Sequence, residues 1–203
     1  MSSAATKKRF TPQEYLALER KSETRSEYYK GEIFAMSGAS REHNLISVNL
    51  LRDIGNQLED RPCEAYTSDM RVSIEATGLY TYPDVSVVCG EPRFQDSEVD
   101  TLLNPMVIVE VLSPTTEAYD RGVKFRHYRR IGSLREFVLI SQDRMMVERF
   151  TRQGNDWVLS DMTDPDQVLK LESIGCQIPL GRIYAKVTFP ETGATEEPNL
   201  HPE

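Results

Sequence analysis

The sequence predicts an α/β or α+β domain in which helices flank a mixed β-sheet. Two β-branched runs, at about 82–89 and 106–112, are typical of buried strands because they are apolar almost throughout. Helix-start signals stand at two places before these runs, and another helical pattern follows them. The expected order is therefore helix, hairpin, helix, strands, helix and strands.

The N-terminal elements carry clear local signals. A capping box with proline at the first helical position predicts a helix beginning at 11–14 and ending near Arg20. The segment 27–36 has a Gly31 turn between two short apolar stretches, which indicates a β-hairpin. Ser40 is expected to cap a second helix over about 41–59.

The later elements are read from apolar runs and their breaks. Strands are expected at about 63–75, 82–89, 106–112, 136–140, 145–150 and 157–159. The polar, proline-containing stretch 90–105 is expected to be a loop, and 117–131 a helix. A turn at Gln142-Asp143 would join the strands of a late hairpin.

Length and charge bound the organisation. We expect one folded domain over 10–187, a flexible N-terminus over 1–9, and a disordered acidic tail over 188–203. The net charge of −8 argues against indiscriminate binding to nucleic acid, which requires neutralisation of phosphates. The charge is uneven, however, because six basic residues and no acid lie between Asp120 and Glu136. They are Arg121, Lys124, Arg126, Arg129, Arg130 and Arg135.

Targeting and cysteine patterns suggest a cytoplasmic protein. The first nine residues lack the apolar core of a signal peptide, and no apolar run approaches the roughly 20 residues that cross a bilayer. No membrane association is expected. Cys63, Cys89 and Cys176 are odd in number and far apart, so neither structural zinc nor a disulfide framework is expected. Cys89 is interpreted as a small core residue.

Two acids are the main candidates for chemistry. Asp84 and Glu110 are each the single charged residue in a β-branched run. A buried carboxylate is costly unless it is compensated, and a bound cation is the usual partner, although pairing with an arginine is the structural alternative. Alternation places Asp84 on the face of Ser86 and Glu110 on that of Ile108. Adjacent strands in matching register would let both acids share Mg²⁺, with Mn²⁺ as a substitute.

Several segments together carry a family resemblance. In chain order they are Glu27…Gly31-Glu32, Ser40…His43, Tyr82-Pro83-Asp84-Val85, Val109-Glu110-Val111-Leu112-Ser113-Pro114 and Asp120…Lys124…Tyr128. Over about residues 10–185 the chain resembles the PD-(D/E)xK nuclease superfamily and, more narrowly, its Uma family. The resemblance implies a restriction-endonuclease-like fold, with a mixed β-sheet flanked by helices. It also implies a Mg²⁺-dependent endodeoxyribonuclease that hydrolyses phosphodiester bonds, with DNA as partner.

The chain departs from the superfamily at the catalytic lysine. That lysine lies two residues after the glutamate, where this chain has Leu112. Lys124, on the next helix, is the expected substitute, because at 100° per residue it shares an apolar stripe with Asp120 and Tyr128. The alternatives for Lys124 are a side chain that extends past the sheet edge, or a simple i,i+4 pair with Asp120.

The resemblance adds three further candidates. Glu27 stands where the family has an acid that completes the metal site, but it could equally be a surface charge on the hairpin. His43 is a candidate general base or supporting group, or else a hydrogen-bonded histidine at a helix start. The carbonyl of Val111 is a candidate metal ligand. Asp69 is interpreted as a turn or sheet-edge residue.

Three functional hypotheses remain open at this point. The first is the nuclease, with Asp84 and Glu110 on Mg²⁺, Lys124 assisting water, and a local basic groove that a homodimer could assemble. The second is a catalytically inactive member of the fold that binds nucleic acid or protein, which the net charge of −8 and the lysine missing at 112 favour. The third is metal-dependent hydrolysis of another substrate. A Lys124 close to both carboxylates would favour the enzyme.

Overall fold

The computed structural model describes residues 8–190. The predictions of a flexible N-terminus and a disordered tail therefore fall almost entirely outside the described residues. Between these limits, none of the helices combines the length and apolar character needed to cross a bilayer.

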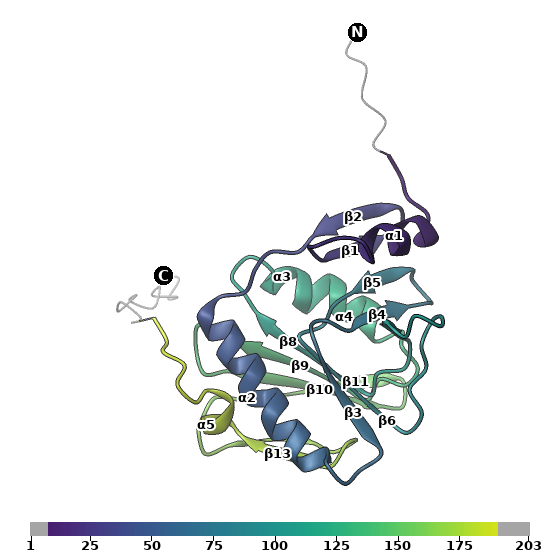
Figure 1. The fold of residues 1–203 in the computed structure, drawn as a ribbon. Helices are drawn as coiled ribbons and strands as arrows, with labels where there is room; N and C mark the ends of the chain where they lie inside the picture. Colours follow the sequence, from purple (N-terminus) through teal and green to yellow (C-terminus); the bar gives the residue numbers. More distant parts are fainter. Residues whose placement is uncertain (1–7, 191–203) are drawn as a thin grey trace, which may run out of the picture.

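Helical segments separate groups of consecutive strands along the chain (Figure 1). The helical segments are α1 (Pro12–Glu19), α2 (Arg41–Leu58), α3 (Glu117–Tyr119), the π-helical turn η1 (Asp120–Lys124), α4 (Phe125–Tyr128) and α5 (Leu180–Ile183). The first strands are β1 (Ser26–Tyr29), β2 (Glu32–Ala35), β3 (Cys63–Thr67), β4 (Arg71–Ile74), β5 (Leu79–Thr81), β6 (Val85–Cys89) and β7 (Thr101–Leu102). The later strands are β8 (Val107–Leu112), β9 (Glu136–Ser141), β10 (Val147–Gln153), β11 (Asp156–Met162), β12 (Val168–Leu171) and β13 (Cys176–Pro179).

The strands form two mixed sheets and a two-stranded antiparallel one. The five-stranded sheet has the order β2-β1-β5-β4-β7, and the six-stranded sheet has the order β11-β10-β9-β8-β6-β3. Each is mixed because it holds one parallel pair, β4 with β7 and β8 with β9, among antiparallel ones. The predicted fold class, a mixed sheet with flanking helices, is confirmed.

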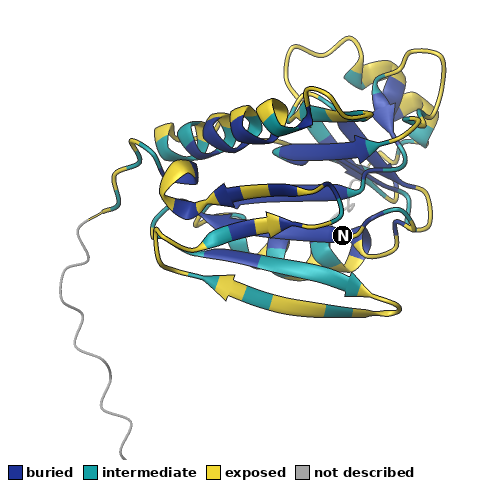
Figure 2. Ribbon diagram, turned by 90° about the horizontal axis from the view of Figure 1, so that it is seen from below, coloured by how far each residue is buried: buried dark blue, intermediate teal, exposed yellow. Residues whose placement is uncertain are grey.

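Two apolar clusters define the layers on the faces of the six-stranded sheet. One cluster joins its valines and isoleucines to α2, α5 and the β12–β13 hairpin. The other joins the opposite face to the five-stranded sheet and to α4, so the helical segment 117–128 lies between the two sheets (Figure 1). The central strands β8 and β9 are buried throughout, whereas β11 at the edge is largely exposed (Figure 2). Helices thus cover both faces of a buried sheet.

The predicted helix starts and the hairpin are confirmed. Thr11 Oγ1 accepts the Glu14 N–H at 3.2 Å, and the Glu14 carboxylate accepts the Thr11 N–H at 2.7 Å. Ser40 caps α2 by accepting the His43 N–H at 3.0 Å. The β1–β2 hairpin turns at Lys30-Gly31, and Gly31 has φ +91°. Local signals sufficed here because each contact lies within a few residues of its partner.

Several predicted boundaries are wrong. The expected strand 63–75 is divided by a turn closed by the Met70 N–H to Thr67 carbonyl bond at 3.0 Å, where the chain leaves one sheet for the other. The expected strand 82–89 begins only at Val85, after the separate short strand β5, so Asp84 stands just before β6. The expected loop 90–105 holds the short strand β7, and β12, β13 and α5 were not predicted. Sheet switching depends on distant partners that local patterns do not reveal.

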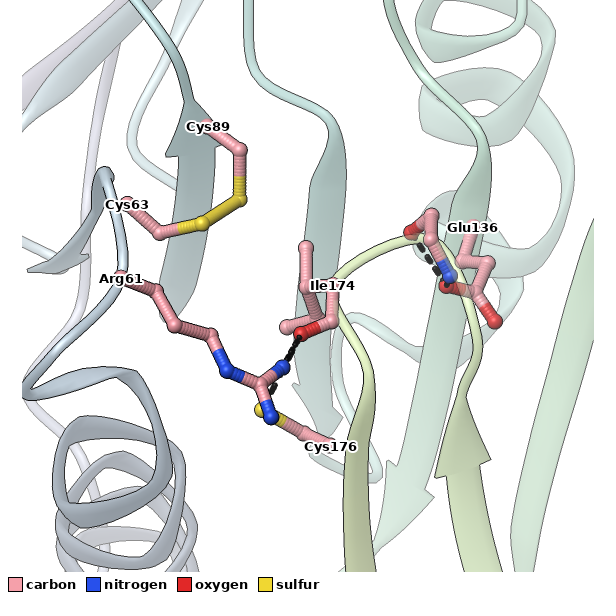
Figure 3. Close-up of a disulfide and its surroundings, with 7 residues drawn as sticks. Arg61, Cys63, Cys89, Glu136, Ile174 and Cys176 are labelled. Atoms are coloured by element: carbon pink, nitrogen blue, oxygen red, sulfur yellow. Dashed lines mark hydrogen bonds between the residues drawn. A yellow bond between two sulfur atoms is a disulfide. The ribbon is translucent and has the colours of Figure 1, made fainter.

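The cysteine prediction is also wrong. Cys63 and Cys89 form a disulfide, because they face each other as directly paired residues of the antiparallel strands β3 and β6 (Figure 3). Their Cα atoms are 4.0 Å apart. Cys89 is therefore half-buried and bonded rather than a free core residue, and Cys176 is the buried free thiol. A separation of 26 residues in sequence conceals this cross-strand contact.

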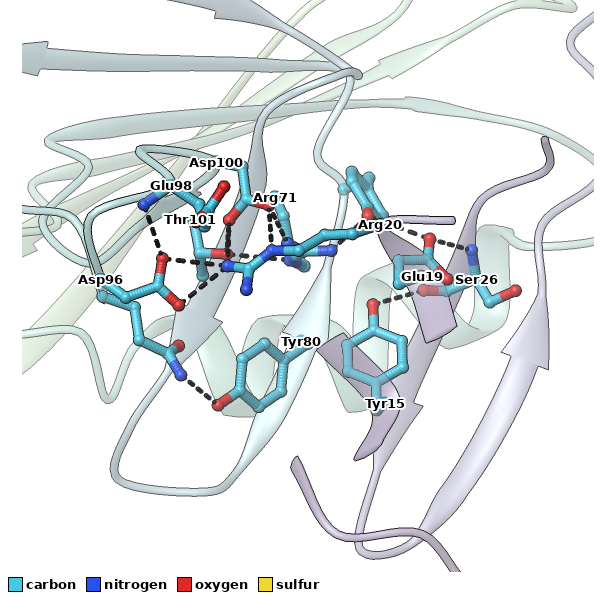
Figure 4. A network of polar contacts seen from close by, with 12 residues as sticks. Tyr15, Glu19, Arg20, Ser26, Arg71, Tyr80, Asp96, Glu98, Asp100 and Thr101 are labelled. Carbon is cyan, nitrogen blue, oxygen red and sulfur yellow. Dashed lines mark hydrogen bonds and ion pairs between the residues drawn. The ribbon is translucent and has the colours of Figure 1, made fainter. Parts of the chain in front are cut away.

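A polar network joins α1 to the five-stranded sheet (Figure 4). The Arg20 guanidinium lies 2.7 Å from Asp100 Oδ2 and 2.8 Å from Asp96 Oδ2. The buried Arg71 side chain lies 2.9 Å from the same Asp100 oxygen and donates to Thr101 Oγ1 at 2.9 Å. The hydrogen bonds from Arg20, supported by Thr101 and Arg71, hold the pKa of Asp100 well below its ordinary value, against the opposing effect of burial.

We expect Asp100→Asn to lower the free energy of unfolding at pH 7 by about 1–2 kcal/mol, a modest value because the carboxylate is partly exposed. A carboxyl whose pKa is lowered by folding stabilises above its unfolded pKa, and this contribution is lost as the pH falls. The difference from wild type should therefore shrink below about pH 4 in urea titrations. Asp96→Asn, which leaves Arg71 paired, should cost less; an equal cost in both variants would contradict the role given to Arg71.

Candidate active site

Strand register brings the two predicted acids together. β6 and β8 are antiparallel neighbours with Val85 opposite Val109 and Ser86 opposite Ile108. One further step along this register places Asp84 opposite Glu110, on the sheet face that carries Ile108. The adjacency and register that the shared site requires are therefore present.

Asp84 is held from two sides. Its Oδ2 accepts the N–H of Val111 at 2.7 Å, and the same oxygen lies 3.2 Å from His43 Nε2. His43 reaches it from the first turn of α2, which the Ser40 cap fixes. The Asp84 side chain is 14% exposed and the Glu110 side chain 4%, so Asp84 is the more accessible of the two acids.

Lys124 lies at the centre of a carboxylate cluster. Its Nζ is 3.1 Å from Glu110 Oε1, 3.2 Å from Glu27 Oε1 and 3.3 Å from Asp120 Oδ1. The residue is only 6% exposed, so it does not extend into solvent. The i,i+4 pair with Asp120 is present as well, but it is one of three contacts. Lys124 belongs to η1, the π-helical turn.

Three hydroxyl groups complete the cluster, and none of them was predicted there from the sequence. Tyr128 donates to Glu110 Oε1 at 2.5 Å, and Thr81 donates to Glu27 Oε1 at 2.5 Å. The Tyr119 hydroxyl lies 3.4 Å from Glu27 Oε2. The spacing of Asp120, Lys124 and Tyr128 was the available signal for the tyrosine, whereas Thr81 joins only through the pairing of β5 with β1.

Burial and charge shift the titration of this cluster. Burial raises the pKa of Glu110 to about 8, and the charges of Asp120 and Asp84 act in the same direction against Lys124. For Lys124, burial opposes the charge, but Glu110, Glu27 and Asp120 outweigh it and raise its pKa well above the ordinary value. The surrounding carboxylates therefore favour the ammonium form of Lys124.

The cluster opens into a cavity of about 620 Å³. The predicted site residues line it together: Glu27, His43, Asp84, Glu110, Val111 and Lys124. Phe34 and Met36, both exposed apolar side chains, contribute from the β2 end. Val111 contributes its N–H to Asp84, and its side chain packs in the core. The structure thus brings all the predicted site residues to one cavity.

The structure also places two other acids, Glu27 and Asp69. Glu27 is 8% exposed and lies inside the cluster, so the surface-charge alternative is wrong. Asp69 lies in the turn after β3, where it pairs with Arg25 at 2.6 Å and does not line the cavity. The interpretation of Asp69 as a turn residue is confirmed.

The oxygen atoms that the site offers can be compared with the ligands that the expected Mg²⁺ prefers. Asp84 and Glu110 offer carboxylate oxygens from paired strand positions, which is the ligand chemistry that Mg²⁺ prefers. Within residues 8–190, no three His, Cys, Asp or Glu side chains converge as a ready metal centre, and Lys124 stands among three of the acids. The two strand acids fit Mg²⁺ with water as the remaining ligands, the arrangement that this ion ordinarily keeps.

Comparison with known proteins agrees with this architecture. The fold is similar to that of a crystal structure described as a "putative nuclease belonging to DUF820" from Anabaena variabilis, with a TM-score of 0.72 and 20% identity, covering 88% of this chain and 99% of that one. "Uncharacterized protein slr1290" from Synechocystis sp. is 38% identical over 93% of this chain and 98% of its own. "Uncharacterized protein sll1609" from the same organism is 39% identical over 80% and 92%.

A family model described as "Uma2: Putative restriction endonuclease" matches residues 12–181. This span contains the residues that line the cavity, from Thr24 to Gln142. The relatives cover nearly all of the chain, so the match is one of the whole domain rather than of a motif. The chain belongs to the Uma2 family.

Proposed function

We propose that this protein is a Mg²⁺-dependent endonuclease that hydrolyses DNA phosphodiester bonds. The observation that carries the proposal is the position of Lys124, whose ammonium group lies within 3.3 Å of Glu110, Glu27 and Asp120. The cavity that it lines also holds Asp84 and His43. Family membership and the fold of the nuclease-like structure support the same conclusion.

Asp84 and Glu110 are the proposed metal ligands, with the Val111 carbonyl as a further one. A bound Mg²⁺, or Mn²⁺ in its place, supplies charge neutralisation at the phosphate and lowers the pKa of a coordinated water. Tyr128 and Val111 orient the two carboxylates, since one donates to each. The protein thereby fixes its ligands before substrate arrives, which is the usual function of such hydrogen bonds.

Lys124 and His43 have different proposed tasks. Because the surrounding carboxylates favour its ammonium form, Lys124 is suited to stabilise negative charge on the phosphate and to orient water. His43 is the proposed proton acceptor, because its imidazole lies at the cavity wall and is held by Asp84 Oδ2 at 3.2 Å. On this proposal, Lys124 stabilises charge and His43 accepts the proton, whereas a single catalytic lysine would otherwise perform both tasks.

The test is cleavage of supercoiled and single-stranded DNA by purified protein in Mg²⁺, Mn²⁺ and EDTA. We expect cleavage with either metal and none in EDTA. Glu110→Gln keeps an acceptor for Tyr128 but loses the charge, so it should show no cleavage in the same preparation. Cleavage that survives EDTA or this substitution would contradict the proposal, since it would come from another site or a contaminant.

A non-catalytic protein of the same fold is the second candidate. It is favoured by one observation: Lys124 already compensates Glu110, Glu27 and Asp120, so the buried charges are balanced by the chain itself. On this alternative the wild type would bind DNA or protein without cleaving any DNA, and Mg²⁺ would leave its thermal unfolding unchanged. Stabilisation by Mg²⁺ that is lost in Glu110→Gln would exclude it.

A further inference from the structure

Four exposed arginines stand together at the far end of the helical segment. Arg126 belongs to α4, and Arg129, Arg130 and Arg135 belong to the turn that leads from α4 to β9. We call them the arginine cluster. In the part of the chain that the structure describes, none of the four guanidinium groups pairs with a carboxylate. Such a group is unusual in a protein with a net charge of −8.

The backbone that carries the cluster is fixed by a fifth arginine. Arg152, from β10, donates to the carbonyls of Arg129 at 2.7 Å and Ile131 at 3.0 Å. Its guanidinium also lies over the Trp157 ring, 4.8 Å from the centroid. The turn is therefore held in one conformation, and the exposed side chains project from a rigid base.

The positive charges of this region are close enough to repel one another. Burial and the neighbouring Arg135 lower the pKa of Arg152, and burial together with Arg126 and Lys30 lowers the pKa of His127. Lys30 is placed beside His127 through Tyr29, whose ring lies 4.9 Å from the imidazole. The region thus gathers several cations on one part of the surface, which favours an external anion as their partner.

We infer that the arginine cluster binds the phosphate backbone of duplex DNA and anchors the substrate at a distance from the cavity. The inference rests on the proposed function. Tyr119 lines the cavity, and the helical segment runs on to Tyr128, directly before Arg129, which is about 13 Å along the axis at roughly 1.5 Å per residue. This distance corresponds to roughly four base pairs of duplex. Planar guanidinium groups suit phosphate oxygens better than ammonium groups do.

The experiment compares two charge-matched double variants. Arg129→Gln/Arg130→Gln removes two charges from the cluster, whereas Arg52→Gln/Lys170→Gln removes two from α2 and β12, which pack on the other face of the six-stranded sheet. Binding of a fluorescent duplex of about 25 base pairs is measured in EDTA between about 50 and 200 mM salt. We expect the slope of log K against log salt to fall by about 1.8 in the first variant and by much less in the control.

Equal slopes in the two double variants would overturn the inference, and so would the absence of salt-dependent binding by wild type. Thermal unfolding of both variants, matched to wild type, shows that the fold is retained. Because binding is measured without metal, its outcome is independent of cleavage. If the slope falls as expected while no DNA is cleaved in Mg²⁺, the anchoring surface stands and the nuclease proposal fails.

Discussion

Asp84→Asn is expected to reduce DNA cleavage by about 10³-fold or more while leaving the fold intact. Asparagine is nearly isosteric, and its amide oxygen can still accept the Val111 N–H that Asp84 now accepts at 2.7 Å. The substitution therefore removes one negative charge without removing the hydrogen bond. A cation in the cavity would then have Glu110 as its one remaining carboxylate of the two proposed ligands. His43 would also lose the negative charge beside its imidazole.

Asp69→Asn is the matched control for this change. It makes the same chemical substitution on a neighbouring turn, where the acid pairs with Arg25 and does not line the cavity. Cleavage rates of supercoiled DNA in Mg²⁺ should be close to wild type for Asp69→Asn. Comparable rates in both variants, or a loss of folded protein for Asp84→Asn by circular dichroism, would contradict the catalytic assignment of Asp84.

Lys124→Met should have the largest effect on stability, about 3–5 kcal/mol in the free energy of unfolding at pH 7. The substitution leaves Glu110, Glu27 and Asp120 buried around an uncharged side chain. Burial already raises the pKa values of Glu110 and Asp120, and loss of the neighbouring ammonium group raises them further above those of the unfolded chain. The penalty is therefore fully present at high pH and should shrink as the pH is lowered toward about 5.

Urea unfolding at the two pH values measures this effect, and a second variant separates charge from packing. Glu27→Gln in the Lys124→Met background removes one of the stranded acids, so it should recover part of the lost stability. The same Glu27→Gln change alone should destabilise, since Lys124 then loses a partner. If Lys124→Met unfolds like wild type, or if Glu27→Gln acts identically in both backgrounds, the cluster is not the unit described above.

The parts of the site that follow from the two-residue period of a strand or the 3.6-residue period of a helix could be predicted from the sequence. Alternation along the strands placed Asp84 and Glu110 on one face, and the four-residue spacing of the helix placed Lys124 beside Asp120. The burial of Glu27 could not be predicted in this way. It depends on β1 joining β5 in a second sheet that packs over the helical segment. The Cys63–Cys89 disulfide is hidden for the same reason, because cross-strand neighbours are set by register rather than by spacing.

The fold shows a similar division. Caps such as those of Thr11 and Ser40 involve residues three apart, so they can be recognised in the chain itself. The β12–β13 hairpin has short strands whose alternate residues, Leu169 and Ile178, pack against α2 and the larger sheet. In sequence, strands this short look like a loop, because they are stabilised mainly by packing against that apolar surface.

The π-helical turn at Asp120–Lys124 has a consequence for how this site could be gained or lost. The Phe125 N–H reaches back to the Asp120 carbonyl, five residues earlier, so the segment contains one residue more than an α-helix of the same rise. Deleting one residue between Asp120 and Lys124 would let the segment close as an ordinary α-helix, with the parts on either side kept in place because the π-turn is what absorbs the extra residue. The two side chains would then stand three residues apart instead of four, so the ion pair that now measures 3.3 Å would have to form with another spacing. The turn is therefore a place where a one-codon deletion changes the contacts of Lys124 while every residue type of the site is still present in the sequence.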